Sequence, residues 1–322
     1  MGFGSVPLGN MGRVMSTSQA RGLIQHAWTA GVRFFDTAPM YGHGLAEYRL
    51  AGELIDQDRE AYTLVTKVGR TLTPAQEGSF DSSPWLNTPA MAMAYDYSYD
   101  GVMRQVEDGL QRMARDKFDV LLVHDTDRWT HGADQPRRFH EAVGGAFKAL
   151  LSLREQGVVD AIGIGVNEVD VCLAAANAVD IDCMLIAGTY TLLDQQAGDE
   201  LLPLCASRGI AVVNGRVFGS GVLATGAHPE ARFNYGVADE TILARVHALE
   251  DLCRRYDVPL GAVAVQFAAS HPAVVTVCLG ASTVEQQAQN YRWFEQAIPD
   301  DLWDELSSAF SLPAHARSSA NR

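Results

Sequence analysis

Apolar residues recur along this chain with two different spacings, and the two kinds of segment alternate from one end to the other. Short apolar runs bounded by polar residues are typical of buried strands, whereas spacings of three and four residues are typical of helices with one buried face. The pattern predicts eight strands, which cover residues 3–9, 32–36, 62–67, 118–124, 161–166, 183–187, 211–214 and 274–279.

At least one predicted helix follows each of these strands. Ser16 and Gln19 have the spacing of a capping box, and helical periodicity continues from there until Gly31. Ser98 is the expected N-cap of a later helix that runs to Met113. Further helices are expected near residues 46–55, 143–151, 170–178, 200–208, 242–256, 260–270, 284–294 and 300–310.

Strands that alternate with helices predict parallel strands joined by right-handed crossovers, and eight of them close a barrel. We therefore expect an α/β protein with a (β/α)8 TIM barrel, extra C-terminal helices and long loops over the barrel mouth. Residues 69–96 and 125–140 are the expected long loops. A doubly wound open sheet is the alternative, but residues 9–12, GNMG, lack its glycine fingerprint. Without an internal repeat or a linker, residues 1–322 are predicted to form a single domain.

Composition narrows the class of protein. A chain with 47% hydrophobic and 20% charged residues is typical of a globular protein. It contains no uninterrupted apolar run of the roughly 18 to 20 residues that a membrane span needs. The first residues, MGFGSVPLGN, lack the features of a secretory signal, so we expect a cytoplasmic protein. The five cysteines are odd in number and widely spaced, which favours reduced thiols in the core.

The net charge of −14 disfavours nucleic acid or an anionic membrane as a partner, because both recruit basic surfaces. The expected partner is instead a small-molecule substrate. An anionic cofactor would have to bind through local hydrogen-bond donors. The sequence does not predict an oligomeric state.

Four polar residues stand at or just after the carboxyl ends of predicted strands: Asp36, Lys67, His124 and Asn167, and Tyr41 follows Asp36 by five positions. Each alone has an ordinary structural explanation. A carboxylate at a strand end is more often a turn or helix cap, a lysine there is usually solvated, and a histidine is usually a rim residue. In a barrel, however, these strand ends share one mouth, which makes their coincidence informative.

Together these residues would make a device for proton transfer without a metal. A phenol normally has a pKa of about 10, and a lysine ammonium nearby favours its ionised form. Asp36 would hold Lys67, and His124 would share the proton or orient a carbonyl oxygen. A metal site is not expected, because the spacing around His124 fits no ligand motif, and Ser220 lacks the G-x-S-x-G spacing of a nucleophile elbow.

With these residues identified, the sequence resembles the aldo-keto reductases, whose barrel uses Asp, Tyr, Lys and His in this chain order. Here Asp36, Tyr41, Lys67 and His124 match that tetrad. The resemblance covers essentially the whole chain and includes the segments FGSVPLGNMG, GVRFFDTAPMYG, VTKVG, LLVHD, IGIGVNE and GASTVEQQAQN. It implies an enzyme that binds a nicotinamide dinucleotide in an extended pose across the barrel mouth, without a separate nucleotide-binding domain.

The resemblance also implies residues that hold the cofactor. Asn167 matches the residue that binds the nicotinamide carboxamide, although it would also serve as a helix cap. The pyrophosphate is expected along Phe218, Gly219, Ser220 and Gly221, and the adenine end near Gly280, Gln286, Gln289 and Asn290. The last two residues would otherwise form a solvated helix face.

The chain departs from the common family pattern at three places. Ala187 stands where a glutamine often lies under the nicotinamide, and Gly215 stands where an aromatic residue often stacks on it. Residues 280–290 contain no lysine or arginine, and Glu285 lies where NADP-dependent members place basic residues. Because a carboxylate repels the 2'-phosphate, we expect NAD as the cofactor rather than NADP.

The segments LLVHD, YTLLDQQ and VVNGRVFGSGVL resemble a subgroup that contains D-threo-aldose (L-fucose, L-galactose) 1-dehydrogenases and, as a close relative, pyridoxal 4-dehydrogenase. Both substrate types present a cyclic hemiacetal. The resemblance implies NAD-dependent oxidation of an aldose such as L-fucose, L-galactose or D-arabinose at C1 to its lactone, with Tyr41 as the acid/base. The alternatives are oxidation of pyridoxal to 4-pyridoxolactone and NADPH-dependent reduction of an aldehyde or ketone.

Met11, Trp85 and Trp129 are candidates for an apolar wall against the substrate ring, and loop packing explains each of them equally well. A different class of function is a nucleotide-sensing regulatory subunit, like the potassium-channel β subunits that share this fold. The intact tetrad argues against pure sensing.

Overall fold

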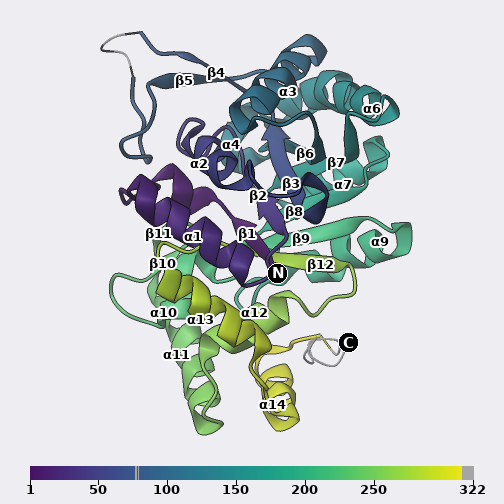
Figure 1. The fold of residues 1–322 in the computed structure, drawn as a ribbon. Helices are drawn as coiled ribbons and strands as arrows, with labels where there is room; N and C mark the ends of the chain where they lie inside the picture. Colours follow the sequence, from purple (N-terminus) through teal and green to yellow (C-terminus); the bar gives the residue numbers. More distant parts are fainter. Residues whose placement is uncertain (77, 79, 314–322) are drawn as a thin grey trace. The chain divides into compact units, whose positions relative to one another are not determined.

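The structure is a computed structural model, which describes residues 1–76, 78 and 80–313 (Figure 1). Within these residues, eight strands form a closed barrel in the order β1-β12-β9-β8-β7-β6-β3-β2. The expected (β/α)8 barrel is therefore confirmed, and the open doubly wound sheet is wrong. The barrel strands are β1 (Gly2–Gly4), β2 (Phe34–Asp36), β3 (Thr63–Val68), β6 (Phe118–His124), β7 (Val159–Val166), β8 (Cys183–Ala187), β9 (Ala211–Gly215) and β12 (Val274–Leu279).

Helices follow the barrel strands as the periodicity predicts. The longer ones are α1 (Thr17–Thr29), α2 (Leu45–Leu54), α3 (Tyr99–Met113), α6 (Phe147–Glu155), α7 (Val169–Ala178), α9 (Leu201–Arg208), α11 (Glu240–Arg255), α12 (Leu260–Ala268), α13 (Val284–Glu295) and α14 (Asp300–Phe310). The capping box at the start of α1 is present, because the Ser16 hydroxyl accepts from the Gln19 amide and the Gln19 side chain accepts from the Ser16 amide. Gly31, at φ +86°, follows the end of this helix.

Three expectations about local structure need correction. The first strand is only Gly2–Gly4, and Val6–Gly9 forms a 3-10 helix. Pro7 explains the change, since it has no N–H to donate to a strand ladder. The insertion at residues 69–96 contains an antiparallel pair, β4 (Arg70–Pro74) and β5 (Met91–Tyr95). Such a pairing is not local in sequence, so periodicity alone does not reveal it.

The third correction concerns residues 125–140, which were expected to be a loop. They contain two short helices, α4 (Arg128–His131) and α5 (Gln135–Glu141). The Asp127 carboxylate caps α4 by accepting from the Thr130 amide at 3.0 Å. These helices are too short and too polar to show a hydrophobic period in the sequence.

The described residues divide into two compact units, the first from residues up to 185 with 280–287 and the second from residues 186–279 with 288–313. The single-domain assignment stays a prediction. In the first unit, α3 packs against α2 and α6, and all three helices bury small and aliphatic side chains (Figure 1). In the second unit, α12 is buried along its whole length.

No helix in the described part of the chain is long and apolar enough to cross a membrane. The five cysteines are all buried and carry free thiols. Burial raises the pKa of Cys183 and of Cys253 to about 12, so these thiols are poor nucleophiles. This agrees with the expectation of core thiols.

The registers of the first unit bring the ends of β2, β3 and β6 together. β2 and β3 are neighbours, with Asp36 opposite Val65, and β3 and β6 are neighbours, with Lys67 opposite Leu122. β7 follows, with Gly165 opposite His124. Parallel strands end on the same side of the sheet, so three of the polar residues singled out in the sequence emerge side by side.

Candidate active site

A buried ion pair joins the ends of β2 and β3. The Lys67 ammonium donates to Asp36 Oδ1 at 2.6 Å and to the Thr37 carbonyl at 2.8 Å. Both side chains are almost completely buried, with 1% of the lysine and 5% of the aspartate exposed. Burial raises the pKa of the Asp36 carboxyl, and the charge and hydrogen bond of Lys67 oppose that rise. Two buried groups of opposite charge are tolerated because each is the other's partner.

Tyr41 lies in the turn after β2, close to the ion pair of Lys67 and Asp36. The Lys67 ammonium is 4.8 Å from the centre of the Tyr41 ring. Two glycines fix the turn, because a Cβ on Gly42 would lie 2.4 Å from the Gly9 carbonyl oxygen and Gly42 itself has φ +66°. The chain can therefore bring the phenol to the ammonium only with glycine at this position.

His124 is the last residue of β6, and its ring faces Tyr41. The two ring centres are 6.1 Å apart, and the rings are nearly perpendicular at 85°. Burial, followed by the positive charges of Arg70 and Lys67, lowers the pKa of His124 well below its usual range, and Asp127 opposes this only in part. The imidazole is therefore neutral near pH 7. The structure thus brings Asp36, Lys67, Tyr41 and His124 together.

Arg70 and Asp125 belong to the same cluster, although the sequence analysis assigned neither of them to the site. Arg70 Nη2 donates to Asp125 Oδ2 at 2.7 Å, and Arg70 Nη1 lies 3.2 Å from His124 Nδ1. Both side chains are nearly buried. The signal in the sequence was their position, because Asp125 directly follows His124, the last residue of β6, and Arg70 lies three residues after Lys67, at the start of β4.

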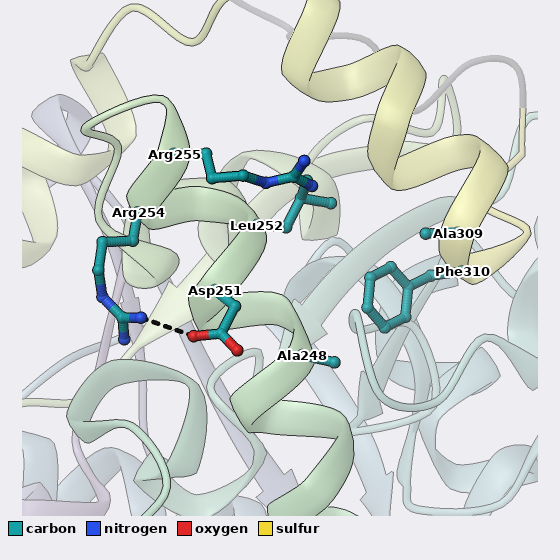
Figure 2. A pocket seen from close by; sticks show the side chains of 7 residues that line it. All are labelled: Ala248, Asp251, Leu252, Arg254, Arg255, Ala309 and Phe310. Atoms are coloured by element: carbon teal, nitrogen blue, oxygen red, sulfur yellow. Dashed lines mark hydrogen bonds and ion pairs between the residues drawn. The ribbon is translucent and has the colours of Figure 1, made fainter.

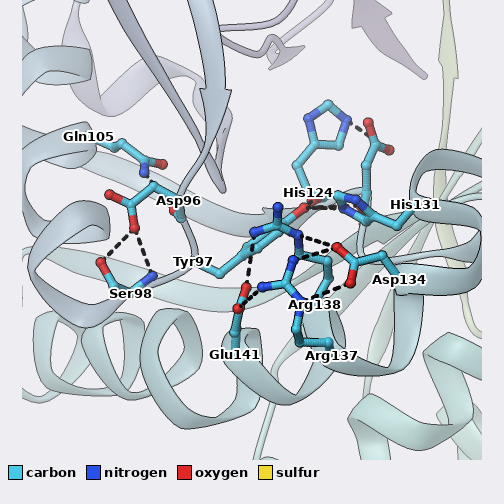
Figure 3. A network of polar contacts seen from close by, with 11 residues as sticks. Asp96, Tyr97, Ser98, Gln105, His124, His131, Asp134, Arg137, Arg138 and Glu141 are labelled. Carbon is cyan, nitrogen blue, oxygen red and sulfur yellow. Dashed lines mark hydrogen bonds and ion pairs between the residues drawn. The ribbon is translucent and has the colours of Figure 1, made fainter.

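Tyr97 holds the backbone at the end of β6. Its hydroxyl lies 2.9 Å from the His124 carbonyl, 3.0 Å from the Asp125 carbonyl and 3.1 Å from His131 Nε2. Figure 3 shows this part of the network, with Tyr97, His124 and His131 labelled. Gly69, at φ +118°, makes room for the ring, since a Cβ there would lie 2.4 Å from it.

Asn167 follows β7, and Asp127 fixes the orientation of its side chain. The Asp127 carboxylate accepts from the Asn167 backbone amide at 2.8 Å and from Asn167 Nδ2 at 3.0 Å. A carboxylate is an acceptor only, so the amide must turn its nitrogen towards Asp127. Asn167 Oδ1 then points away from Asp127 and can accept a hydrogen bond from another amide. This geometry fits a carboxamide ligand.

Glu168 ties the start of α4 to the end of β7. Its two carboxylate oxygens accept from the backbone amides of Arg128 and Trp129, each at 2.9 Å. This contact was not foreseen from the sequence, which gave no sign that residues 128–131 form a helix. Trp129 itself is 56% exposed.

The other two expected substrate contacts lie closer to the phenol. Trp85 is buried, and its ring centre is 6.1 Å from that of Tyr41. Met11 pairs with Trp85 through an isolated antiparallel bridge. The structure therefore places Trp85 against the tetrad and Met11 next to Trp85, while Trp129 is at the surface.

The expected pyrophosphate segment lies in the second unit, after β9. Gly219, Ser220 and Gly221 all have positive φ, at +57°, +64° and +113°. The Ser220 hydroxyl accepts from the Tyr235 amide at 3.0 Å, and Phe218 packs edge-on against Trp293. A run of positive φ angles without bulky side chains is typical of backbone that approaches an anion closely. This segment fits a diphosphate.

Residues expected near the adenine lie on or before α13. Gly280 is exposed and close to Pro7, where a Cβ would come within 3.2 Å of the ring. Gln286 is exposed and accepts from the Ser282 amide at 2.9 Å, Gln289 accepts from Arg292 at 2.7 Å, and Asn290 is buried. Gln286 and Gln289 have local partners and Asn290 is buried, so the cofactor contacts of all four residues stay predictions.

A cavity of about 650 Å³ lies elsewhere, between α11 and α14 in the second unit (Figure 2). Side chains of these two helices line it, and Arg254 and Asp251 form an ion pair at 2.6 Å on one side. None of the residues singled out in the sequence lines it. In residues 1–76, 78 and 80–313, no group of three or more His, Cys, Asp or Glu residues is placed to hold a metal ion.

Comparison with known proteins identifies the class that this barrel and tetrad define. The aldo/keto reductase family model matches residues 1–310, and the chain belongs to that family. It is therefore an oxidoreductase, and aldo-keto reductases act on small molecules with a nicotinamide cofactor.

Individual relatives narrow the subgroup. Pyridoxal 4-dehydrogenase of Microbacterium luteolum is 42% identical over 96% of this chain and 93% of the relative. D-threo-aldose 1-dehydrogenase of a Pseudomonas species is 35% identical over 97% of this chain and 94% of the relative. These are the two enzymes whose subgroup the sequence resembles. The fold also matches an aldo-keto reductase from Bacillus halodurans in its holo form, with a TM-score of 0.74, 23% identity, and coverage of 98% of this chain and 95% of that one.

The lowered pKa of His124 makes folding depend on pH. Below about pH 6.5 the unfolded chain binds a proton at this histidine that the folded chain does not. The free energy of unfolding therefore decreases as the pH is lowered below this value. We expect a loss of about 1.4 kcal/mol per pH unit from this residue, and none above pH 6.5. Urea unfolding between about pH 5.5 and 7.5 would measure it, with His124→Gln as the comparison. Parallel pH profiles for the two proteins would contradict this prediction.

Proposed function

We propose that this enzyme oxidises a cyclic hemiacetal to its lactone with NAD as the cofactor. The observation that carries the proposal is the contact of the buried Lys67 ammonium with both Asp36 and the Tyr41 ring. A positive charge at that place favours negative charge on the phenol oxygen, which is what a base for a hydroxyl proton needs.

Each tetrad residue then has a separate task. Tyr41 takes the proton of the hemiacetal hydroxyl, while the C–H bond on the same carbon is broken to form the lactone carbonyl. Lys67 stabilises the phenolate, and Asp36 keeps Lys67 in place without touching the substrate. His124 donates a hydrogen bond to the substrate oxygen, since its imidazole is neutral. When bound, the nicotinamide supplies the hydride acceptor.

The chain's own residues support a nicotinamide dinucleotide. Asn167 offers its amide oxygen to the carboxamide, because Asp127 holds its nitrogen. Along the pyrophosphate, residues 218–221 would provide backbone close to the anion, and Arg216, which donates to the Ala187 carbonyl at 2.7 Å, brings a positive charge to the start of this segment. In a chain with a net charge of −14, such a local cation offsets the general repulsion of a diphosphate.

The preference for NAD rests on Glu285 at the start of α13. A hydrogen bond from its own backbone amide and one from Thr283 lower the pKa of this exposed carboxyl, so it is ionised near neutrality. An ionised carboxylate near the adenine ribose repels a 2'-phosphate. The cytoplasm, where we place the enzyme, supplies the oxidised cofactor.

Two substrates fit the proposed chemistry. An aldose is the substrate in the name of the 35% identical relative, D-threo-aldose 1-dehydrogenase. Pyridoxal is the substrate in the name of the 42% identical relative, pyridoxal 4-dehydrogenase. The buried Trp85 beside Tyr41 favours pyridoxal, because a flat aromatic ring gains more from an aromatic wall than a sugar does.

A substrate panel with NAD tests the reaction. We expect oxidation of pyridoxal, or of L-fucose, L-galactose or D-arabinose, measured as NADH formation and as lactone product. Pyridoxal 5'-phosphate and the methyl glycosides of the sugars are matched controls, because neither can present a free hemiacetal hydroxyl. Oxidation of the controls, or no oxidation of any of the four substrates, would refute the proposal.

Substitution of the base tests the assignment of Tyr41. Tyr41→Phe should lower kcat by about 10²- to 10⁴-fold and leave NAD binding nearly unchanged, because only the proton acceptor is lost. Steady-state kinetics and quenching of protein fluorescence by NAD would measure the two effects. Tyr48→Phe is the control, since Tyr48 is a half-exposed residue on α2. Full turnover in Tyr41→Phe would remove Tyr41 as the base.

Substitution of Glu285 tests the cofactor preference. Glu285→Gln removes the repulsion of the 2'-phosphate and should raise kcat/KM for NADP by about fivefold, without changing that for NAD. Glu295→Gln, at the exposed end of the same helix, is the matched control. A wild-type enzyme that prefers NADP would show that Glu285 does not select the cofactor.

A further inference from the structure

The two ring nitrogens of His124 face partners of opposite charge. Nδ1 lies 3.2 Å from Arg70 Nη1, and Nε2 lies 3.4 Å from Asp125 Oδ1. Arg70 and Asp125 are themselves joined at 2.7 Å.

The contact with Arg70 determines where the proton of the imidazole is. A guanidinium has only N–H donors and keeps its charge in proteins, so the nitrogen that it contacts must be an acceptor. Nδ1 is therefore unprotonated, and the single proton of the neutral ring is on Nε2. A doubly protonated ring would place an N–H against an N–H and two positive charges 3.2 Å apart.

We propose that Arg70 is a positioning residue that holds His124 in the neutral tautomer with its proton on Nε2, so that the imidazole can only donate a hydrogen bond at the substrate oxygen. The catalytic consequence rests on the proposed function. The tautomer itself follows from the contacts of Arg70 and does not depend on the substrate.

Arg70 is suited to this task because it cannot turn away. One side of the guanidinium is bound to Asp125, and its centre lies 4.8 Å from the centre of the Tyr95 ring. Asp125 raises the pKa of Arg70 further above its usual range despite burial, so the charge is permanent. The second amino group is thereby aimed at His124.

Some charged groups near the imidazole lower its pKa and others raise it. Lys67 from β3 and Arg70 disfavour a second proton, Asp127 from the segment after β6 favours it, and burial outweighs Asp127. The Tyr41 ring faces the imidazole from the turn after β2, and the Tyr97 hydroxyl contacts the His124 carbonyl. Asp125 is too distant, at 3.4 Å, to hold the Nε2 proton tightly, so a substrate oxygen can take its place.

Nitrogen NMR of the full-length protein labelled with 15N-histidine tests the proposal directly. The His124 signals are identified by their absence in His124→Gln. We expect a protonated Nε2 and an unprotonated Nδ1, with no titration at pH values near the ordinary histidine pKa of about 6.5. A protonated Nδ1 in the wild-type protein, in either a neutral or a charged ring, would overturn the proposal.

Variants of Arg70 separate positioning from general stability. In Arg70→Met we expect the two tautomers to mix, the His124 titration to move towards pH 6.5, and kcat to fall by about a hundredfold. Arg70→Lys keeps a charged donor and should restore the tautomer. Arg138→Met is the control, because Arg138 also lies near the Tyr95 ring, at 5.8 Å, but its guanidinium pairs with Asp134 and Glu141. Unchanged tautomer and titration in Arg70→Met would refute the role of Arg70.

Removing Arg70 leaves the buried Asp125 without its ionic partner, which can cost stability. The double variant Arg70→Met/Asp125→Asn removes both charges and keeps the test valid, because a folded double variant must still lose the fixed tautomer. If the NMR results hold while Tyr41→Phe retains full turnover, the proposed reaction fails and the tautomer stands.

Discussion

The buried pair of Lys67 and Asp36 is the interaction on which the rest of the site depends. An ammonium removed from water is stable only beside a fixed negative group, and the Thr37 carbonyl completes the set of acceptors. This arrangement requires β2 and β3 to be adjacent and in register, with Asp36 opposite Val65. The turn after β2 can then bring Tyr41 over the ammonium, which it does only because Gly9 and Gly42 allow the backbone to approach closely.

The charged Lys67 and the neutral imidazole of His124 thus lie at the ends of two neighbouring strands, β3 and β6. The Lys67 ammonium is held by Asp36 in a buried ion pair. At His124, the positive charges of Arg70 and Lys67 add to the effect of burial in lowering its pKa. In the proposed reaction, proton acceptance and hydrogen-bond donation fall to different residues because of their surroundings, not because of their chemical type alone.

The same logic extends to residues outside the tetrad. Asp127 orients the Asn167 amide, Glu168 holds the first turn of α4, and Tyr97 fixes the carbonyls at the end of β6. Each is a polar side chain that is satisfied by backbone or amide groups on a neighbouring element. Such contacts make the strand ends rigid, and rigidity is what a site needs to hold small distances constant.

The sequence by itself determined the alternation of strands and helices, and with it the barrel and the places of Asp36, Lys67 and His124 at neighbouring strand ends. These features depend on local periodicity and on the rule that parallel strands end on one side. Only the tertiary structure decided that Arg70 and Asp125 join His124, that β4 and β5 pair, and that residues 128–131 form a helix. Those contacts link segments that have no common period in the sequence, such as Arg70 and Asp125 or Glu168 and Trp129. Because a hydrogen bond depends on distance in space, its partner cannot be read from residue types until the barrel has set which strand ends are adjacent.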